Sequence, residues 1–286
     1  MKTKGTEKTA LIIQGGAFRS VFTAGVLDAF LVNGYNPFDI YISVSSGAMC
    51  LAYYLSGQYK MVHRMMIELS KDSDFMSASQ VFSEQGYMNL EYLEEYSQKN
   101  YPLDIDAALK TTDGKECYMV ATNLESGEAK YLQPNKKNFL ACLRATATLP
   151  FVTKGNCEVD GIKLMDGGWS DPIPGKSAVA FGATKLIAIR TVPVGYKIDW
   201  SYAGWMASYW HGDNEKLSNQ FANDHLFYNE GVDYLNDNPD HIEIHQIAPD
   251  QELHTGGYSI SSESLFQDYH LGLEKGLDFL RKIREE

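Results

Sequence analysis

Apolar runs near the N-terminus are separated by turn residues in an order that predicts strand, helix, strand and helix. The first run ends in two glycines, which is typical of a buried strand that enters a tight loop. The apolar positions after Ser20 recur at helical spacing, and Gly34 stands where the C-terminal cap of that helix belongs. We therefore predict a strand at Ala10–Ile13, a helix from Ser20, a strand at Asp39–Val44 and a helix at Ser46–Leu55.

Two strands joined by a crossover helix form a βαβ unit, so we expect a mainly parallel sheet between two helical layers, an α/β/α fold. The rest of the chain continues this pattern. Strands are predicted at Glu116–Thr122, Glu158–Met165, Lys185–Arg190 and His241–Ile247, and helices at Leu90–Asn100, Asn138–Thr146, Glu215–Leu235 and Ser261–Arg284. Because neither a repeat nor a Ser/Gly linker interrupts the chain, residues 1–286 are predicted to form one domain, with insertions at about 58–109 and 196–240 beside the sheet.

The composition permits a large core and narrows the range of partners. Of the 286 residues, 44% are hydrophobic and 22% charged, which excludes a disordered or fibrous protein. With 25 Lys and Arg against 37 Asp and Glu, the net charge is −12. This charge argues against a nucleic-acid partner, which needs clustered basic residues. It also argues against electrostatic docking on an anionic membrane, whereas hydrophobic contact with lipid stays open.

The cysteines and the apolar runs bear on the location of the protein. The four cysteines include no CxxC pair, so neither a zinc site nor a disulfide framework is indicated and reduced thiols are expected. The first apolar run is shorter than the roughly 7 to 15 apolar residues of a secretory signal. No run approaches the roughly 20 apolar residues of a membrane-spanning helix. We expect a cytoplasmic protein.

The candidate nucleophile is a serine between the second predicted strand and its helix, in the sequence SVSSGA. A nucleophile elbow turns so sharply that the positions two before and two after its serine must be small. Ser45 is the serine that meets this requirement, with Ser43 before it and Gly47 after it. Its hydroxyl would project from the carboxyl edge of the sheet, beside helix N–H groups that stabilise an oxyanion. The structural alternative is a Ser-rich helix cap.

The second candidate is the loop QGGAFRS at 14–20. Gly15 and Gly16 let backbone amides approach an anion, and the following helix adds its positive end. An oxyanion hole and a phosphate cradle both fit these residues. The loop lacks the GxGxxG spacing and the GK[ST] ending of nucleotide sites. Arg19 would steady the loop, meet a substrate phosphate or form a surface ion pair.

The third candidate is the sequence MDGGW at 165–169, directly after a predicted strand. By itself an Asp-Gly pair indicates a turn more often than a catalytic base. Nothing in the spacing along the chain shows whether Asp166 lies near Ser45.

Taken together, the three motifs resemble those of the patatin-like phospholipase family, in which a Gly-rich loop with an arginine, an early elbow serine and a distant Asp-Gly-Gly follow one another. The sequence LRATATLPF at 143–151 resembles the family segment that leads to the Asp motif, and DPIP at 171–174 resembles its continuation. The resemblance covers residues 8–192. It implies an α/β/α fold and a serine lipid acyl hydrolase that uses no cofactor and no metal.

The resemblance also implies a role for each motif. Ser45 would be the nucleophile, Asp166 the general base, and the backbone amides of Gly15, Gly16 and Ala17 the oxyanion hole. Six further residues of the motifs would support these groups: Arg19, Ser43, Ser46, Gly47, Gly167 and Gly168.

The chain departs from the family pattern at three positions where glycine is usual, namely Ala17, Ser20 and Ser43. Each replacement adds a small side chain and leaves the backbone N–H in place. Ser43 adds crowding behind the nucleophile, so we expect slower chemistry rather than an inactive site.

Histidine, the usual partner of a catalytic serine, stands in no motif that marks it as a base or a metal ligand. His241 and His245 lie four residues apart in a predicted strand, which would place them on one face without making them ligands. We therefore expect Asp166 to accept the hydroxyl proton directly. That transfer needs a separation of about 2.6–3.2 Å and a site from which water is excluded.

Two apolar regions bear on the substrate, which we expect to be an acyl ester or a phospholipid reached through transient contact with a membrane surface. The aromatic-rich stretch Asp199–Tyr234 would form a flap over an acyl groove, a patch that contacts lipid, or ordinary packing of the insertion. It contains Trp200, Trp205, Trp210, Tyr202, Met206, Tyr209, Phe221, Phe227 and Tyr228. Met61, Met65 and Met66 would form an adaptable acyl wall or ordinary core.

Two other functions stay open. The departures at Ala17, Ser20 and Ser43 favour a binding or regulatory protein on a patatin-like scaffold with weak or no activity. Gly15, Gly16 and Arg19 would also suit an α/β protein that binds a phosphate-bearing ligand. Fold alone does not decide among these functions. Ester hydrolysis that depends on Ser45 would identify the protein as an enzyme.

Overall fold

A computed structural model of the chain describes residues 7–75, 89–149, 157–201, 204, 208, 212–256 and 260–285. The end of the family-like stretch, Pro150 and Phe151, lies outside the described residues, and so do five of the residues named in the aromatic-rich stretch of the second insertion. These are Trp205, Trp210, Tyr202, Met206 and Tyr209.

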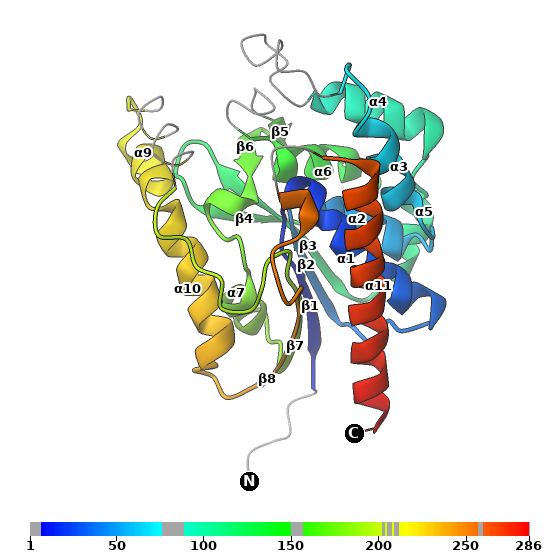
Figure 1. The fold of residues 1–286 in the computed structure, drawn as a ribbon. Helices are drawn as coiled ribbons and strands as arrows, with labels where there is room; N and C mark the ends of the chain where they lie inside the picture. Colours follow the sequence, from blue (N-terminus) through cyan, green and yellow to red (C-terminus); the bar gives the residue numbers. More distant parts are fainter. Residues whose placement is uncertain are drawn as a thin grey trace.

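A mixed, mainly parallel sheet forms the centre of the molecule (Figure 1). Successive strands in the series β5-β6-β3-β2-β1-β7-β8 are hydrogen-bonded to each other, and β4 also pairs with β3. The parallel strands are β1 (Thr9–Ile13), β2 (Ile40–Val44), β3 (Glu116–Asn123), β7 (Lys185–Ile189) and β8 (Glu243–Ile247). The antiparallel strands are β4 (Ala129–Leu132), β5 (Cys157–Val159) and β6 (Ile162–Asp166).

Helices cover both faces of the sheet, which gives the expected three-layer α/β/α fold (Figure 1). Both faces of β1 and β2 are buried, as is usual for parallel strands between helical layers. One layer contains α1 (Ser20–Val32), α2 (Ser46–Leu55), α3 (Met61–Leu69), α4 (Leu90–Asn100), α5 (Ile105–Thr111), α6 (Phe139–Ala147) and α11 (Ser262–Glu285). The opposite layer contains α7 (Gly175–Ala180) and α10 (Asp224–Asp237), with α9 (Glu215–Ala222) beside them.

The predicted elements exist, but three of the predictions are wrong in detail. The predicted strand Glu158–Met165 is a hairpin of β5 and β6, because Asp160 and Gly161 have positive φ angles of 51° and 81° and reverse the chain. The predicted helix Glu215–Leu235 is interrupted at Asn223, which divides it into α9 and α10. His241 lies outside β8 with a φ angle of 52°, so it does not share a strand face with His245.

The C-terminal helix α11 packs directly on α1, the helix that follows the Gly-rich loop. Glycines allow this close approach, because a Cβ atom on Gly272 would lie 2.0 Å from the carbonyl oxygen of Phe22. The last helix of the chain therefore supports the element that begins beside the candidate site.

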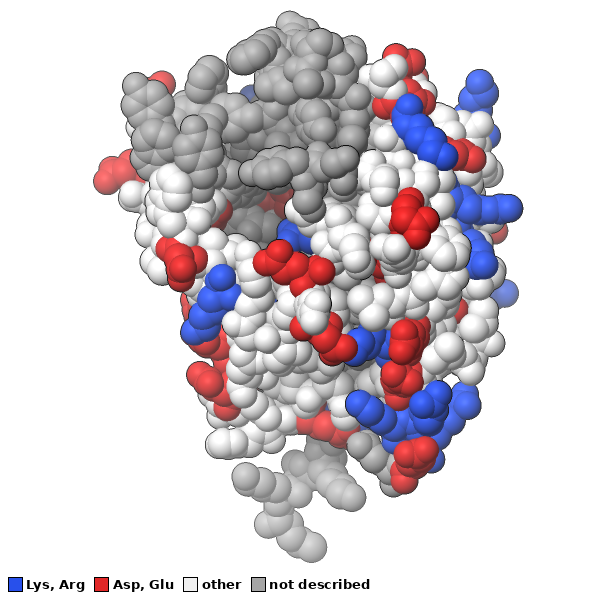
Figure 2. All heavy atoms as spheres, viewed as in Figure 1, with Lys and Arg blue, Asp and Glu red and all other residues white. Residues whose placement is uncertain are grey.

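The described surface mixes charged and uncharged residues. Acidic and basic residues are interspersed on the face shown in Figure 2, with extensive uncharged surface between them. Among the helices of the described residues, none combines the length and apolar character needed to cross a bilayer.

Candidate active site

Ser45 occupies the sharp turn between β2 and α2, as the sequence predicts for an elbow. Its backbone has φ 54° and ψ −135°, a combination that is rare for any residue other than glycine and that marks strain held in place by the surrounding structure. Gly47 allows this turn, because a Cβ atom there would lie 2.8 Å from the carbonyl oxygen of Gln14. Ser43 is fully buried at the end of β2, and its hydroxyl donates weakly to the carbonyl of Tyr118 at 3.4 Å.

The strand registers bring Asp166 to Ser45. Strand β2 pairs with β3 as far as Val44 opposite Val120, and β6 pairs with β3 from Asp166 opposite Ala121. Because β4 occupies the other edge of β3 at both positions, β2 and β6 must share one edge. They run toward each other along it, so the C-terminal ends of β2 and β6 meet at Val44 and Asp166. Residues more than a hundred positions apart in the sequence become neighbours in this way.

Asp166 is buried, and one of its oxygens is left for a proton donor. Oδ1 accepts the N–H of Gly168 at 2.7 Å, whereas Oδ2 accepts no hydrogen bond from the described residues in the resting geometry. Burial raises the pKa of Asp166 to about 6, against the lowering effect of the Ser45 hydroxyl and of the Gly168 N–H. The Ser45 hydroxyl therefore lies near this carboxyl group, although no bond between the two meets full hydrogen-bond geometry. Catalytic hydrogen bonds are often loose until substrate binds.

The Gly-rich loop lies against the elbow. A Cβ atom on Gly15 would lie 2.8 Å from the Cβ of Ser45, so only glycine permits this approach. Gly16 donates its N–H to the hydroxyl of Ser46 at 3.2 Å, and Ala17 has a positive φ of 50°. The residues predicted to form an oxyanion hole are thus beside the nucleophile, with the Gly16 amide already engaged.

Ser20 has a role in this loop that the sequence did not reveal. It is fully buried, and its hydroxyl lies 2.6 Å from that of Ser46, which in turn accepts from Gly16. A serine in place of the usual glycine therefore completes a chain of hydrogen bonds to the loop. Arg19 contributes one long contact, from Nε to the carbonyl of Gly16 at 3.5 Å, and forms no ion pair with the described residues.

Two threonines of the family-like stretch hold both candidate catalytic residues. The hydroxyl of Thr146 accepts the backbone N–H of Ser45 at 2.9 Å and donates to the carbonyl of Val120. The backbone carbonyl of Thr148 accepts the N–H of Asp166 at 2.8 Å. The signal for these roles was the resemblance of the stretch itself, since no local pattern distinguishes one threonine from another.

Replacing Thr146 by valine should lower the free energy of unfolding by about 2 kcal/mol, because the Ser45 N–H and the Val120 carbonyl both lose a buried partner. Urea unfolding would measure this change. Thr146→Ser is the matched control, because it keeps the hydroxyl and loses only a methyl group. Equal stability of the two variants would contradict the role of the hydroxyl.

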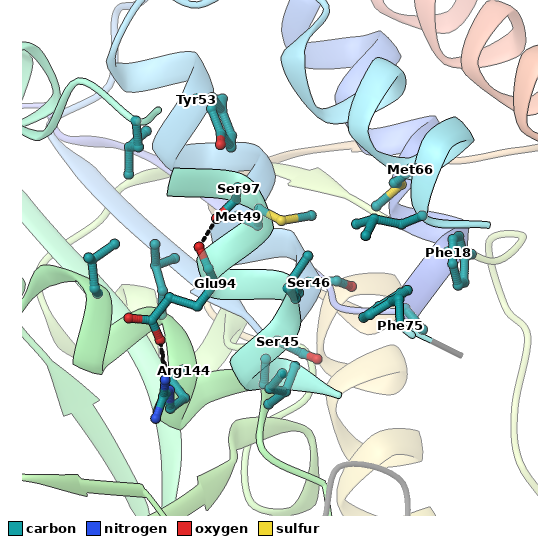
Figure 3. Close-up of a pocket in the computed structure, with 18 of the residues that line it drawn as sticks. Phe18, Ser45, Ser46, Met49, Tyr53, Met66, Phe75, Glu94, Ser97 and Arg144 are labelled. Carbon is teal, nitrogen blue, oxygen red and sulfur yellow. Dashed lines mark hydrogen bonds and ion pairs between the residues drawn. The ribbon is translucent and has the colours of Figure 1, made fainter. Parts of the chain in front are cut away.

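An apolar cavity of about 150 Å³ opens onto Ser45 and Ser46. Figure 3 shows Phe18, Met66 and Phe75 on one side of these serines, and Glu94 with Arg144 on the other. Most of the wall is aliphatic or aromatic, and α4 contributes part of it. The remaining lining residues are Ala17, Met49, Tyr53, Leu69, Leu90, Leu93, Ser97, Leu103, Leu140, Leu143, Ala147 and Leu149.

Arg144 of α6 forms ion pairs with two glutamates of α4 at this cavity, Glu94 and, at 3.9 Å, Glu91. Arg144 donates to Glu94 from Nε at 2.8 Å and also from a terminal nitrogen (Figure 3). Because the charges of Arg144 and Glu94 satisfy each other, this pair closes the wall of the cavity without leaving a free charge inside it.

The two apolar regions singled out in the sequence divide between cavity and core. Met66 lines the cavity beside Ser45, while Met65 is fully buried in the core. Phe221 and Tyr228 are also buried, which agrees with ordinary packing of the insertion. Trp200 is 59% exposed.

Histidines stand apart from the cavity in the described part of the chain. None of the described histidines lines it; His245 contacts Glu243 at 2.5 Å, and His254 contacts the buried Asp268 at 2.9 Å. Within the described ranges, no group of three or more His, Cys, Asp and Glu side chains is arranged to hold a metal ion.

Comparison with known proteins gives two family matches. A family model described as patatin-like phospholipase matches residues 11–179, and a domain of unknown function, DUF6363, matches residues 214–286. The chain is 31% identical over 281 residues to the uncharacterized protein YjjU of Escherichia coli K12. The alignment covers 96% of this chain and 78% of YjjU. The crystal structure of VipD from Legionella pneumophila aligns with a TM-score of 0.47 and 10% identity, covering 97% of this chain and 67% of that one.

Proposed function

Because the chain belongs to the patatin-like phospholipase family, we propose that it is a serine hydrolase of acyl lipids that works through a Ser45–Asp166 dyad. The observation that carries this proposal is the meeting of β2 and β6 at their C-terminal ends. It puts a strained elbow serine beside a buried carboxylate whose Oδ2 has no donor among the described residues.

The mechanism is acyl transfer in two steps. Asp166 takes the hydroxyl proton while Ser45 Oγ attacks the ester carbonyl, and collapse of the tetrahedral intermediate expels the alcohol with that proton. The acyl group is then an ester of Ser45. Water that gives its proton to Asp166 attacks this ester, and the fatty acid leaves as Ser45 recovers its hydrogen.

The Gly-rich loop supplies the oxyanion hole in this proposal, through the amides of Gly15, Gly16 and Ala17. The Gly16 amide would exchange its bond with Ser46 for one with the oxyanion. Gly167 and Gly168 support the base: a Cβ on Gly167 would strike the carbonyl of Val120, and the N–H of Gly168 holds Oδ1.

The departures from the family pattern are compatible with activity. Ser20 is accommodated by its bond with Ser46, and Ala17 adopts the positive φ that a glycine would provide. Ser43 is buried beside the nucleophile, so reduced turnover stays a prediction for this position. These contacts favour a working hydrolase over an inactive scaffold.

The apolar cavity above Ser45 suits the hydrocarbon chain of an acyl ester, because its wall offers dispersion contacts and few hydrogen-bonding groups. We also propose that residues 1–286 form one domain, which the continuous sheet from β5 to β8 and the packing of α11 on α1 support. The four unpaired cysteines support the proposed cytoplasmic location.

Ester profiling combined with adduct mapping tests the function. We expect a fluorophosphonate to modify Ser45, as located by mass spectrometry, and esters with longer acyl chains to be hydrolysed with lower KM than acetyl esters. Phospholipid vesicles would show whether the substrate includes a phosphate head group. An adduct on another residue, with no turnover of any ester, would refute the proposal.

The rate should depend on pH through Asp166. Burial raises the pKa of this carboxyl group from 3.8 to about 6, and only the deprotonated form accepts the Ser45 proton. The value of kcat/KM should therefore be half-maximal near pH 6 and fall about tenfold per pH unit below it. Initial rates between pH 4.5 and 8 would test this, with circular dichroism as a control for folding. A flat profile down to pH 4.5 would exclude Asp166 as the base.

A further inference from the structure

Arg190 is a fully buried cation at the carboxyl end of β7. Its exposed fraction is 0%, and it is the largest of the fully buried side chains in the described residues. Strand β7 lies between β1 and β8, and the side chain of Arg190 bridges residues from both neighbours.

Within the described part of the chain, the hydrogen-bond partners of Arg190 are all neutral. Its Nε donates to the side-chain carbonyl of Gln14 at 3.1 Å, one terminal nitrogen to that of Gln246 at 3.1 Å, and the other to the hydroxyl of Tyr228 at 3.3 Å. No carboxylate of the described residues lies within ion-pair distance of the guanidinium. Burying a charge without an opposite charge is unfavourable, so a simpler core residue would have stabilised the fold better.

The position of Arg190 relates this charge to the Gly-rich loop. Gln14 is the residue before Gly15, and its backbone N–H donates to the carbonyl of Ile189 at 3.0 Å. Thr191, which follows Arg190, donates its hydroxyl to the carbonyl of Gly15 at 2.7 Å. A Cβ on Gly16 would lie 2.7 Å from the same hydroxyl oxygen. Residues 190 and 191 therefore hydrogen-bond to Gln14 and Gly15, and Thr191 packs closely against Gly16.

We propose that Arg190 is a positioning residue for acyl transfer, which fixes the Gly-rich loop together with Thr191 and keeps an unneutralised positive charge behind it. This inference rests on the proposed function for its kinetic part. Negative charge that develops on the oxyanion is stabilised by a fixed positive charge in a water-poor interior, where screening is weak. The absence of a carboxylate partner among the described residues preserves that field, since a neutralised guanidinium would contribute little.

Three variants of the full chain separate position from charge. Arg190→Met removes both the hydrogen bonds and the charge, and Arg190→Lys restores the charge. Gln246→Glu leaves the loop contacts intact and places a carboxylate on the guanidinium from the side of β8. Hydrogen exchange of the amides of residues 14–19, measured without substrate, reports the order of the loop. Hydrolysis of a nitrophenyl ester reports kcat and KM.

We expect Arg190→Met to exchange the loop amides at least tenfold faster and to lose at least tenfold in kcat, with KM changed less than threefold. Arg190→Lys should recover part of kcat. Gln246→Glu should leave amide exchange within threefold of the parent while kcat still falls severalfold, a result that a purely structural role does not produce.

Unchanged amide exchange in Arg190→Met, or an unchanged kcat in Gln246→Glu, would overturn the inference. A parent protein that hydrolyses no ester would instead refute the proposed function, and the exchange measurement would still decide whether Arg190 positions the loop. The two proposals can therefore fail separately.

Discussion

Replacing Ser45 by alanine should abolish ester hydrolysis, with a loss in kcat of about 10⁴-fold or more, because the atom that carries the acyl group is removed. The elbow holds this serine in a strained conformation, with φ 54°, where it lines the apolar cavity. Initial rates with a short nitrophenyl ester would measure the loss. Labelling by a fluorophosphonate should disappear at the same time.

Ser46→Ala is the matched control for this experiment. Ser46 also lines the cavity, but its hydroxyl is occupied by the Gly16 N–H and by Ser20. We expect Ser46→Ala to retain labelling at Ser45 and to lose much less activity than Ser45→Ala. The opposite ranking, with Ser46→Ala inactive and Ser45→Ala active, would show that the nucleophile had been misassigned.

The second large effect is expected for Asp166→Asn. Asparagine keeps the shape of the side chain and the acceptor for the Gly168 N–H, but its nitrogen cannot take the Ser45 proton. We expect kcat to fall about 10³-fold while the protein stays folded, since general bases contribute about 10²–10⁴-fold to such reactions. Steady-state kinetics and thermal unfolding on the same samples would measure both quantities.

Asp171→Asn controls for the loss of a neighbouring carboxylate. Asp171 accepts hydrogen bonds from Tyr131 and Ser177, both at 2.6 Å, and so fixes the segment after the Asp-Gly-Gly motif without facing Ser45. Its replacement should affect stability more than turnover. Full activity of Asp166→Asn would mean that another group accepts the proton.

Much of the fold was predictable from local patterns. Helix α2 has the bounds that its apolar pattern and following glycine predict, and β1, β2, β3 and β7 differ from prediction by a residue at one end. The error at Glu158–Met165 also had a local cause, because Asp160-Gly161 is a two-residue hairpin signal within the supposed strand. Local chain geometry depends mainly on nearby residues, which is why these features can be derived from sequence.

The nucleophile elbow could also be predicted from nearby residues alone. Its requirement for small residues on both sides of Ser45 is a steric condition within one turn, and the φ of 54° agrees with it. The Gly-rich loop and the Asp-Gly-Gly motif were visible for the same reason. What the sequence by itself determined is therefore the set of chemical groups and the secondary structure that carries each of them.

Only the tertiary structure decided which of these groups meet. Asp166 reaches Ser45 because β2 and β6 share one edge of β3, and this follows from hydrogen-bond registers between strands far apart in the sequence. The supporting role of Thr146 and the neutral surroundings of Arg190 depend on the same long-range pairing. A register has no local signature, since it is set by how whole faces pack, and so the proximity of the two candidate catalytic groups is a property of the folded sheet.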